Sequence, residues 1–425
     1  RGLGSVGVVT DVDPYNLPIN AYSRAKNVRF SDGNVSKGPI LRGVSGAVSW
    51  TPAFSYGLIA QTGYDTVLVV DNTFDIYELN NGAFSQVLNS TSTSSLSSIT
   101  ATTLADVQYV NRSDQAPVSR VSTAINFTTL ANWPAGYKAN SLRSFGDFLL
   151  ALGTVEGGVS FPNRVRFSDP VQANQVPTTW DETDLTNSAG FNDLVQMKTP
   201  IVDGATLGPN FLVYSKDQVW MMEFVGGTFI FNFRKVFDDA GVINQNCIVE
   251  VEGKHYVFDR DDIYVTDGNT RQSICDGRVR DYIFSGMDNS KADVCFVIHN
   301  TKLEELYFCY HSGDDMALYT GGTKCNRAAV YNYKEDNWSF QDLPNVVSGS
   351  EANINSVTSY ATATQTYADI GGSYHDQESP YGRNPLVVSL ADADAGTSVS
   401  KVYGLDLVDQ GSLSQSLDTT VSPEF

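Results

Sequence analysis

Hydrophobic strings recur along this chain, and each runs through a short polar turn into a second string rich in aromatic residues. Their Val and aromatic content favours β-strands, so each pair of strings predicts a hairpin. The predicted hairpins are FLVYSKDQVWMMEFV from Phe211, HYVFDRDDIYVTDG from His255, CFVIHNTKLEELYFCY from Cys295, AAVYNYKEDNWSF from Ala328, TVLVVDNTFDIYEL from Thr66 and SFGDFLLALG from Ser144. Repeated hairpins with no helices between them indicate an antiparallel array such as a β-propeller. This pattern disfavours the enzyme classes that are built on alternating strands and helices.

The spacing of the predicted turns supports a propeller of irregular construction. The turn residues Lys216, Arg260 and Asn300 are 44 and 40 residues apart, near the ~40–45 residues of a typical propeller blade. Asp71, Gly146 and Lys216 are 75 and 70 residues apart, so an insertion or a missed hairpin lies in each interval. The chain carries no WD or kelch signature, and the pattern does not fix the number of blades.

The chain divides into two regions. Residues 1–345 are predicted to form the propeller core, with an inserted excursion at about 89–140 that begins in a Ser/Thr tract. Residues 346–425 are rich in Ser, Thr and Asp, and we expect them to form a peripheral β region or the truncated start of another module. The chain begins without Met and stops at Phe425 in mid-phrase, which is typical of a processed or partial product.

A single segment predicts a helix. Asp276 would cap GRVRDYIFSGM, which starts at Gly277. The apolar residues of this segment recur at near-helical spacing and would share one face: Val279, Tyr282, Ile283 and Met287.

Charge and cysteine content narrow the possible partners. The 48 acidic and 28 basic residues give a net charge of −20, the wrong sign for a protein that grips nucleic acid by its phosphates. The five cysteines are far apart and never in CxxC spacing, so we expect buried free thiols in strands and a reducing compartment. No apolar run reaches 18 residues and the first residues lack a leader pattern, so we expect neither a transmembrane helix nor a signal peptide.

Two short motifs resemble ligand sites, but both lack the required context. GLGSVG at Gly2 matches the dinucleotide fingerprint, yet no strand precedes it and Pro14 stands where its helix should run. The DRDD cluster at Asp259 suggests a calcium loop, but Tyr264 and Thr270 occupy positions six and twelve, where an EF-hand has Gly and Glu. We therefore favour turn-forming aspartates, and not a calcium site, for this cluster and for DADAG at Asp392.

A sialidase-like propeller is the main enzymatic alternative. RFSDP from Arg166, followed by TTWDETD, loosely resembles an Asp-box, but Pro170 replaces the permissive residue and Trp180 comes too late. A cluster of arginines, or a pair of acids converging in one pocket, would favour this alternative. The four histidines show no metal spacing, and we expect core or edge positions for His255 and His299. No catalytic, cofactor or metal residue is therefore predicted.

Several long phrases carry a resemblance that short motifs do not. They are NLPINAYSRAKNVRFSDGNVSKGP from Asn16, NWPAGYKANSLRSFGDFLLALG from Asn132, FPNRVRFSDPVQANQVPTTWDETDLTNSAGFNDL from Phe161, IVDGATLGPNFLVYSKDQVWMMEFVGGTFIFNFRKVF from Ile201 and GVINQNCIVEVEGKHYVFDRDDIYVTDGNTRQSICDGRVRDYIF from Gly241. In these phrases the chain resembles the tail nozzle proteins of short-tailed, podovirus-type bacteriophages. The resemblance runs from about Asn16 to Pro344 and is weak beyond Asn345.

The resemblance implies a structural virion protein and no enzyme. Such subunits are propeller-based, usually form a ring of six below a dodecameric adaptor, and share the tail with tail fibres. The ring forms the distal tail tube, retains packaged DNA and conducts it during ejection, without sequence-specific binding and without membrane insertion by this chain. It belongs to the virion tail and is assembled in the host cytoplasm. The alternatives are a glycan-degrading propeller and a tail tip that binds host glycans without cutting them.

Overall fold

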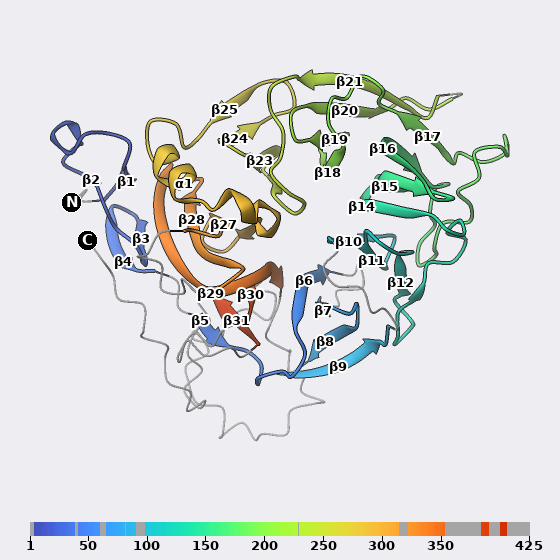
Figure 1. The fold of residues 1–425 in the computed structure, drawn as a ribbon, viewed down its shortest axis with the longest axis horizontal. Coiled ribbons are helices and arrows are strands. Elements are labelled where there is room, and N and C mark those ends of the chain that lie inside the picture. The colour runs from blue at the N-terminus through green and yellow to red at the C-terminus, as the bar shows by residue number, and fades with distance from the viewer. Residues whose placement is uncertain are drawn as a thin grey trace.

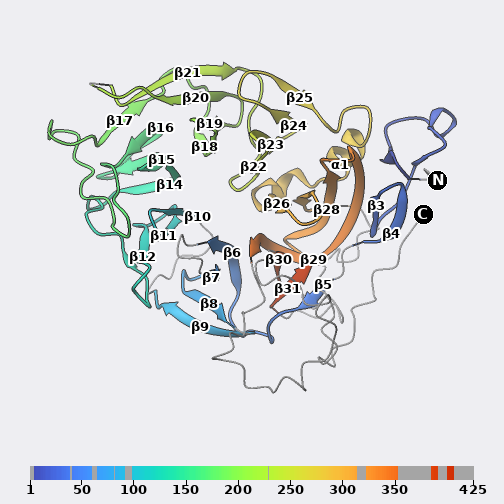
Figure 2. The same ribbon diagram turned by 180° about the vertical axis from the view of Figure 1, so that it is seen from behind.

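Most of the chain forms four-stranded antiparallel sheets that surround a central axis (Figures 1 and 2). The computed structural model describes residues 4–38, 41–59, 65–80, 82–90, 98–227, 229–313, 322–352, 384–390 and 400–405. Within these residues, five four-stranded sheets and one nine-stranded sheet follow one another around the axis. The nine-stranded sheet contributes two blades, and we number the blades 1 to 7 in chain order. The irregular antiparallel β-propeller that the sequence predicted is confirmed.

Each of the first five blades is a meander of four consecutive strands that begins with the strand nearest the axis. Blade 1 comprises β6 (Pro52–Ile59), β7 (Asp65–Asp71), β8 (Ile76–Asn80) and β9 (Ala83–Leu88). Blade 2 comprises β10 (Ile99–Leu104), β11 (Val107–Arg112), β12 (Val118–Val121) and β13 (Thr128–Thr129). Blade 3 comprises β14 (Lys138–Phe145), β15 (Phe148–Glu156), β16 (Val159–Phe167) and β17 (Gly190–Asp193). Blade 4 comprises β18 (Ile201–Leu207), β19 (Asn210–Ser215), β20 (Val219–Phe224) and β21 (Phe231–Phe237). Blade 5 comprises β22 (Ile248–Val251), β23 (Lys254–Phe258), β24 (Ile263–Thr266) and β25 (Arg271–Ser273).

Blades 6 and 7 share one long strand, β29 (Asn337–Ala352). Blade 6 consists of β26 (Phe296–Asn300), β27 (Glu305–Tyr310), β28 (Cys325–Asn332) and the first part of β29. The second part of β29, from Val346 onward, pairs with β30 (Asn384–Ser389), which pairs with β31 (Lys401–Leu405). The outer strand of blade 6 therefore becomes the inner strand of blade 7.

The N-terminal region closes the ring. Strand β5 (Leu41–Gly43) pairs with β31 and is the outermost strand of blade 7, although it directly precedes blade 1 in the chain. The residues before β5 form β1 (Gly7–Val8), a 3₁₀ turn (Pro14–Asn16), β2 (Ala21–Tyr22), β3 (Val28–Ser31) and β4 (Asn34–Lys37). They lie outside blade 6 (Figure 1). Buried ion pairs attach them there, Lys26 to Asp342 (3.2 Å) and Arg29 to Glu305.

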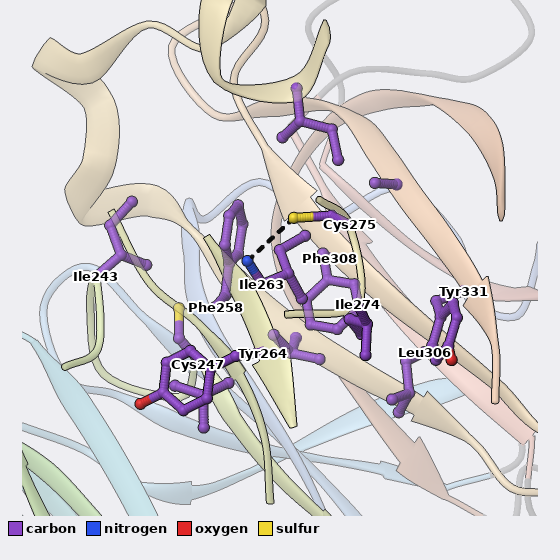
Figure 3. Packing of buried hydrophobic residues seen from close by; sticks show 14 of the residues in the cluster. Ile243, Cys247, Phe258, Ile263, Tyr264, Ile274, Cys275, Leu306, Phe308 and Tyr331 are labelled. Carbon is purple, nitrogen blue, oxygen red and sulfur yellow. Dashed lines mark hydrogen bonds between the residues drawn. The ribbon is translucent and has the colours of Figure 1, made fainter. Parts of the chain in front are cut away.

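The core is a circle of hydrophobic clusters, each between two or more adjacent blades. In β15, Leu149 belongs to the cluster shared with blade 2, and Leu150 belongs to the cluster shared with blade 4. Because both faces of such a strand are buried, its sequence is continuously apolar rather than alternating. Figure 3 shows the largest cluster, where Phe258 of blade 5 packs near Phe308 of blade 6 with ring centroids 5.8 Å apart.

The six predicted hairpins are all present as paired strands. The predicted helix is also present as α1 (Arg280–Gly286), with Val279 and Ile283 fully buried. The predicted cap is wrong: Val279 occupies the N-cap position, and the carboxylate of Asp11 accepts the N–H of Asp281 in the first turn at 3.1 Å. Asp276 precedes the N-cap residue in the chain, and its carboxylate accepts a hydrogen bond from the guanidinium of Arg280.

Two expectations about domain organisation differ from the structure. The stretch 89–140, expected to be an inserted excursion, contains the whole of blade 2, because its strands are buried and paired despite their polar composition. The region 346–425, expected to be peripheral, supplies β30 and β31, whose residues are mostly buried within blade 7. Much of the Ser/Thr tract and most of the C-terminal region, including DADAG at Asp392, lie outside the described residues.

Candidate functional site

The main concave feature on the axis is a cavity of about 390 Å³ that the innermost strands of the seven blades enclose. Every one of these strands, or the residue that leads into it, contributes to the lining. Propeller axes are concave places where polar groups from many strands converge, so this cavity is the first place to look for a ligand or catalytic site. Its charged or titratable lining residues are Tyr56, Arg143, Asp203, His299 and Glu351.

Arg143 of β14 and Asp203 of β18 form a buried bidentate ion pair. The Nε of Arg143 donates to Oδ1 of Asp203 at 2.8 Å, and Nη2 donates to Oδ2 at 2.6 Å. The other donors of Arg143 reach the carbonyl oxygen of Ala101 in β10 (3.2 Å) and Oδ1 of Asn246 (3.0 Å), which lies just before β22. One guanidinium therefore joins blades 2, 3, 4 and 5.

The carboxylate of Asp203 also accepts several hydrogen bonds from the protein. Besides Arg143 it accepts hydrogen bonds from Ser141 Oγ (2.7 Å), from the backbone N–H of Gly204 (2.9 Å) and from the backbone N–H of Asn246 (3.0 Å). Burial alone would raise the pKa of this carboxyl, but the nearby Arg143 guanidinium and the hydrogen bonds lower the pKa below its ordinary value. Asp203 is thus held ionised and saturated, which suits a structural clamp and not a proton donor.

The other charged side chains of the cavity are also engaged with the protein. Glu351 of β29 accepts a hydrogen bond from the backbone N–H of Thr301 (2.9 Å) in the turn after β26. His299 of β26 lies with Nε2 3.3 Å from the hydroxyl of Tyr333. The Ser348 hydroxyl receives the backbone N–H of Ser55 at 3.1 Å and so joins β29 to β6. The polar groups of the axis therefore connect inner strands that share no backbone ladder.

A second charged cluster lies on blade 3, at the place where the sequence loosely resembled an Asp-box. Arg166 is bound by Glu156 (2.9 Å) and Glu182 (2.8 Å), and Arg164 is bound by Glu156 (2.8 Å) and Asp193 (2.7 Å).

Arginines and acids do converge here, but each of these charged side chains already forms an ion pair with a side chain of opposite charge. Hydrogen bonding to Arg166 lowers the pKa of Glu182, and Arg166 also lowers the pKa of Glu156 against the raising effect of burial. A general acid in glycoside hydrolysis needs a raised pKa, so this cluster does not have the electrostatics of such a site.

The remaining sequence motifs have local structural roles. Gly7 lies in β1, and a Cβ at this position would meet the carbonyl oxygen of Trp338 at 2.6 Å, so close strand packing requires a glycine here. Gly2 lies outside the described residues. Asp259 accepts hydrogen bonds from the backbone N–H groups of Gly241 (2.9 Å) and Arg260 (2.7 Å), as expected of a turn aspartate. Within the described residues, no three His, Cys, Asp or Glu side chains are grouped as metal ligands.

His255 lies in the core as the sequence predicted, and the cysteines are buried as predicted, although three of them lie just outside strands: Cys247, Cys275 and Cys295. His255 is buried between the Tyr214 hydroxyl and the carbonyl oxygen of Thr206, both at 2.8 Å, and burial lowers its pKa. His299 is on the edge of the axial cavity, and His375 falls outside the described residues. All five cysteines are free and buried, and burial raises the pKa of Cys275 and of Cys295 to about 12.

The sequence did not identify Arg143, Asp203 or Asn246. They are scattered polar residues on or beside separate strands and match no motif, so only the ring arrangement of the blades brings them together. A charged residue within a short, mostly apolar stretch, such as Asp203 in IVDGATL, was the one available signal. No helix in the described part of the chain has the length and apolar character needed to cross a membrane.

Comparison with known proteins gives distant structural neighbours alone. No protein-family profile and no curated protein matches the chain. One similar solved chain comes from the crystal structure of a mitotic checkpoint complex, with 10% identity and a TM-score of 0.44 over 85% of this chain and 92% of that one. Another is PorZ, a bacterial surface component of the type-IX secretion system of Porphyromonas gingivalis, with 12% identity and a TM-score of 0.43 over 74% of this chain and 36% of that one. At such scores neither neighbour informs function.

Proposed function

We propose that this chain is a structural subunit of the distal tail tube, the nozzle, of a short-tailed bacteriophage. Copies form a ring, with six as the expected number, below the tail adaptor and beside the tail fibres. The ring retains packaged DNA and conducts it during ejection. The proposal rests on the long phrases between Asn16 and Pro344 that resemble tail nozzle proteins.

One structural observation supports the proposal: the polar side chains on the axis bind other groups of the protein. Arg143, Asp203 and Asn246 are engaged in holding four blades together, as expected of a rigid wall element. In an enzyme of this fold, the same place would be expected to present groups poised for substrate.

DNA would pass beside the propellers and not through them. A cube with the volume of the axial cavity, about 390 Å³, has an edge of about 7 Å, less than the ~12 Å width of the DNA major groove alone. The DNA path is therefore the lumen enclosed by several copies. A net charge of −20 disfavours adhesion of phosphates to such a wall, so DNA can slide along it.

The position of the chain in the phage particle tests this proposal. We expect a reconstruction of the tail to place the propeller in six copies on the tail axis below the adaptor. Absence of the chain from the particle, or a position on peripheral fibres, would refute the proposal.

Purified protein gives an independent test against the glycan alternatives. We expect no turnover of host capsular polysaccharide or lipopolysaccharide and no binding to either. Turnover that is lost in a Glu182→Gln variant would instead favour a glycan-degrading propeller. Binding without turnover would favour a glycan-binding tail tip.

The charge of the lumen gives a third test. Once the lumen-facing acids are located, their replacement by lysine is expected to slow ejection without preventing tail assembly. Equal numbers of replacements on the outer surface of the ring serve as the control. Normal ejection by the lumen variants would show that the acidity serves only solubility.

A further inference from the structure

A pocket of about 240 Å³ lies between the N-terminal region and blade 6. Residues around β1 and between β2 and β3 form one side of it, and α1, β28 and β29 form the other. Its wall contains three cations, Arg24, Lys26 and Arg327, and no acid among the described residues. A chain of net charge −20 has a general excess of acids, so a wall of this sign is a local feature that the proposed function does not use.

Two of the three cations are buried. Lys26 is 8% exposed and Arg327 is 2% exposed, whereas Arg24 is exposed to solvent. An anion that approaches from solvent can therefore meet Arg24 first and the two buried cations afterwards. Burying a charge is costly unless an opposite charge accompanies it.

The two buried cations share the carboxylate of Asp342 in β29. Its Oδ2 lies 3.2 Å from Nζ of Lys26 and also accepts Nδ2 of Asn27 at 3.0 Å. Its Oδ1 lies 3.8 Å from Nε of Arg327, which is too far for a hydrogen bond. Two positive charges and one negative charge leave these three groups with a net charge of +1, which a bound anion would offset.

The guanidinium of Arg327 is well anchored and still has a donor to offer. Its Nη1 donates to the Tyr282 hydroxyl at 3.2 Å and to Ser312 Oγ at 3.3 Å. Its Nη2 is buried, and no described residue accepts a hydrogen bond from this atom. Because a buried donor that lacks an acceptor is costly, this atom favours the oxygen of a ligand.

The rest of the pocket wall is apolar and discriminates between anions. Val8, Ala25 and Phe340 are buried, and the ring of Tyr282 packs edge-on against Phe340 with centroids 4.9 Å apart. Inorganic phosphate would press charged oxygens against these groups, which is unfavourable. A carboxylate on a short hydrocarbon body would place its oxygens on the cations and its carbon atoms on the apolar wall. A cavity of ~150 Å³ holds benzene, so this pocket has room for such a body.

We propose that this pocket binds a small organic carboxylate, with the oxygens against Arg327 and Lys26 and the hydrocarbon body against Phe340. The ligand would touch the N-terminal region on one side and blade 6 on the other, and so would fasten them together. A free molecule and a carboxylate side chain of another protein offer the same chemistry. The site does not depend on the proposed tail function.

Calorimetric titration of the full chain with benzoate tests the proposal. Benzamide has nearly the same shape without the charge, and inorganic phosphate has the charge without the hydrocarbon body. We expect benzoate to bind at least about tenfold more tightly than either, a difference of ~1.4 kcal/mol. Equal binding of benzamide would show an apolar pocket only, and equal or tighter binding of phosphate would show no apolar selection. Either result overturns the proposal, as does the absence of benzoate binding.

Substitutions in the buried group should change benzoate affinity in opposite directions. Lys26→Met removes a positive charge and should weaken binding at least about tenfold, whereas Asp342→Asn removes the competing acid and should tighten it. Changes in the same direction would contradict electrostatic selection.

An exposed variant keeps the test decisive if the buried variants do not fold. Arg24→Gln should weaken binding by a smaller factor, because solvent screens an exposed charge. The matched control is Arg260→Gln, which replaces an exposed arginine on a turn of blade 5 and should leave the affinity unchanged. Unchanged affinity in Arg24→Gln or in Lys26→Met would place the ligand elsewhere and overturn the proposal.

Hydrogen exchange shows where the ligand acts. The N–H of Val9 donates to the carbonyl oxygen of Tyr22 at 2.9 Å and joins the two segments that form one side of the pocket. Saturating benzoate should slow exchange at Val9 and leave blade 3 unchanged, and the absence of this protection would contradict the proposal. A blocked tripeptide with one glutamate, compared with butyrate, identifies the source. Equal affinities indicate a carboxylate presented by a protein, binding of butyrate alone indicates a free ligand, and binding of neither refutes the site.

Discussion

Replacing Asp203 by Asn is expected to destabilise the propeller strongly, although the two side chains have nearly the same shape. The carboxylate of Asp203 accepts bonds from Arg143, Ser141, Gly204 and Asn246. An amide offers one accepting oxygen, and its NH₂ group would face donors of Arg143 or Asn246. The side chains of the pair are only 17% and 2% exposed, so the charge of Arg143 would be left buried without compensation.

The expected magnitude follows from that burial. Removing one partner of a buried ion pair costs ~3–5 kcal/mol, because an uncompensated charge remains. With a urea dependence near 3 kcal/mol per molar, the unfolding midpoint should fall by about 1–1.7 M. The matched control is Asp239→Asn, whose exposed pair with Arg271 should contribute ~0–1 kcal/mol. The double variant Arg143→Gln/Asp203→Asn should recover part of the loss, since no charge is then stranded.

The pH dependence provides a second check. The folded pKa of Asp203 is lowered, so its contribution is fully present above the unfolded pKa of about 3.9 and is lost as pH falls through the lower folded pKa. The stability difference between wild type and Asp203→Asn should therefore be constant from pH 8 to pH 5 and shrink only in acid. Equal midpoints for Asp203→Asn and Asp239→Asn would refute the clamp.

Three further predictions concern the rest of the core. Burial lowers the pKa of His255 below about 6.5, so wild-type stability should decline as pH falls from 7.5 to 5.5 more than that of His255→Gln, and parallel melting curves would contradict this. Gly57→Ala should cost at least ~1–3 kcal/mol in denaturant unfolding, because its Cβ would lie 2.2 Å from the carbonyl oxygen of Glu351; Gly46→Ala, with open space around it, is the neutral control. A thiol reagent should label none of the five cysteines in the native protein and all five in denaturant, because their thiols are buried and their pKa values raised; fast native labelling would show an error in the core.

The hairpins could be predicted because each strand is continuously apolar and each turn is polar, as in Phe211–Phe224. Blade 2 was missed because its turn residues, Ala105 and Asp106, lack the Asn-Gly or Asp-Gly signal although both have positive φ. The spacing argument was only partly sound. Lys216 and Arg260 occupy equivalent turns between second and third strands, whereas Asn300 is the last residue of a first strand.

The axial clamp and the closure of the ring could not be predicted, for a different reason. Arg143 and Asp203 are 60 residues apart in separate blades, and a period-two strand pattern does not say which polar side chain faces a neighbouring sheet. The pairing of Leu41 with Leu405 depends on the total number and twist of the blades, a property of the whole ring and of no local segment.

The pairing of β5 with β31 has a consequence for biosynthesis. A ribosome that adds ~5–20 residues per second needs roughly 20–70 s to pass from β5 to β31. Throughout that interval the nascent chain is an open arc in which the face of blade 1 that packs against blade 7 is uncovered, and the corresponding face of blade 6 is uncovered once blade 6 has been made. The arc exposes strand edges and apolar surface that invite pairing with other nascent chains. Yield in the cell should therefore depend on translation speed and on chaperones that hold the arc until its last blade arrives.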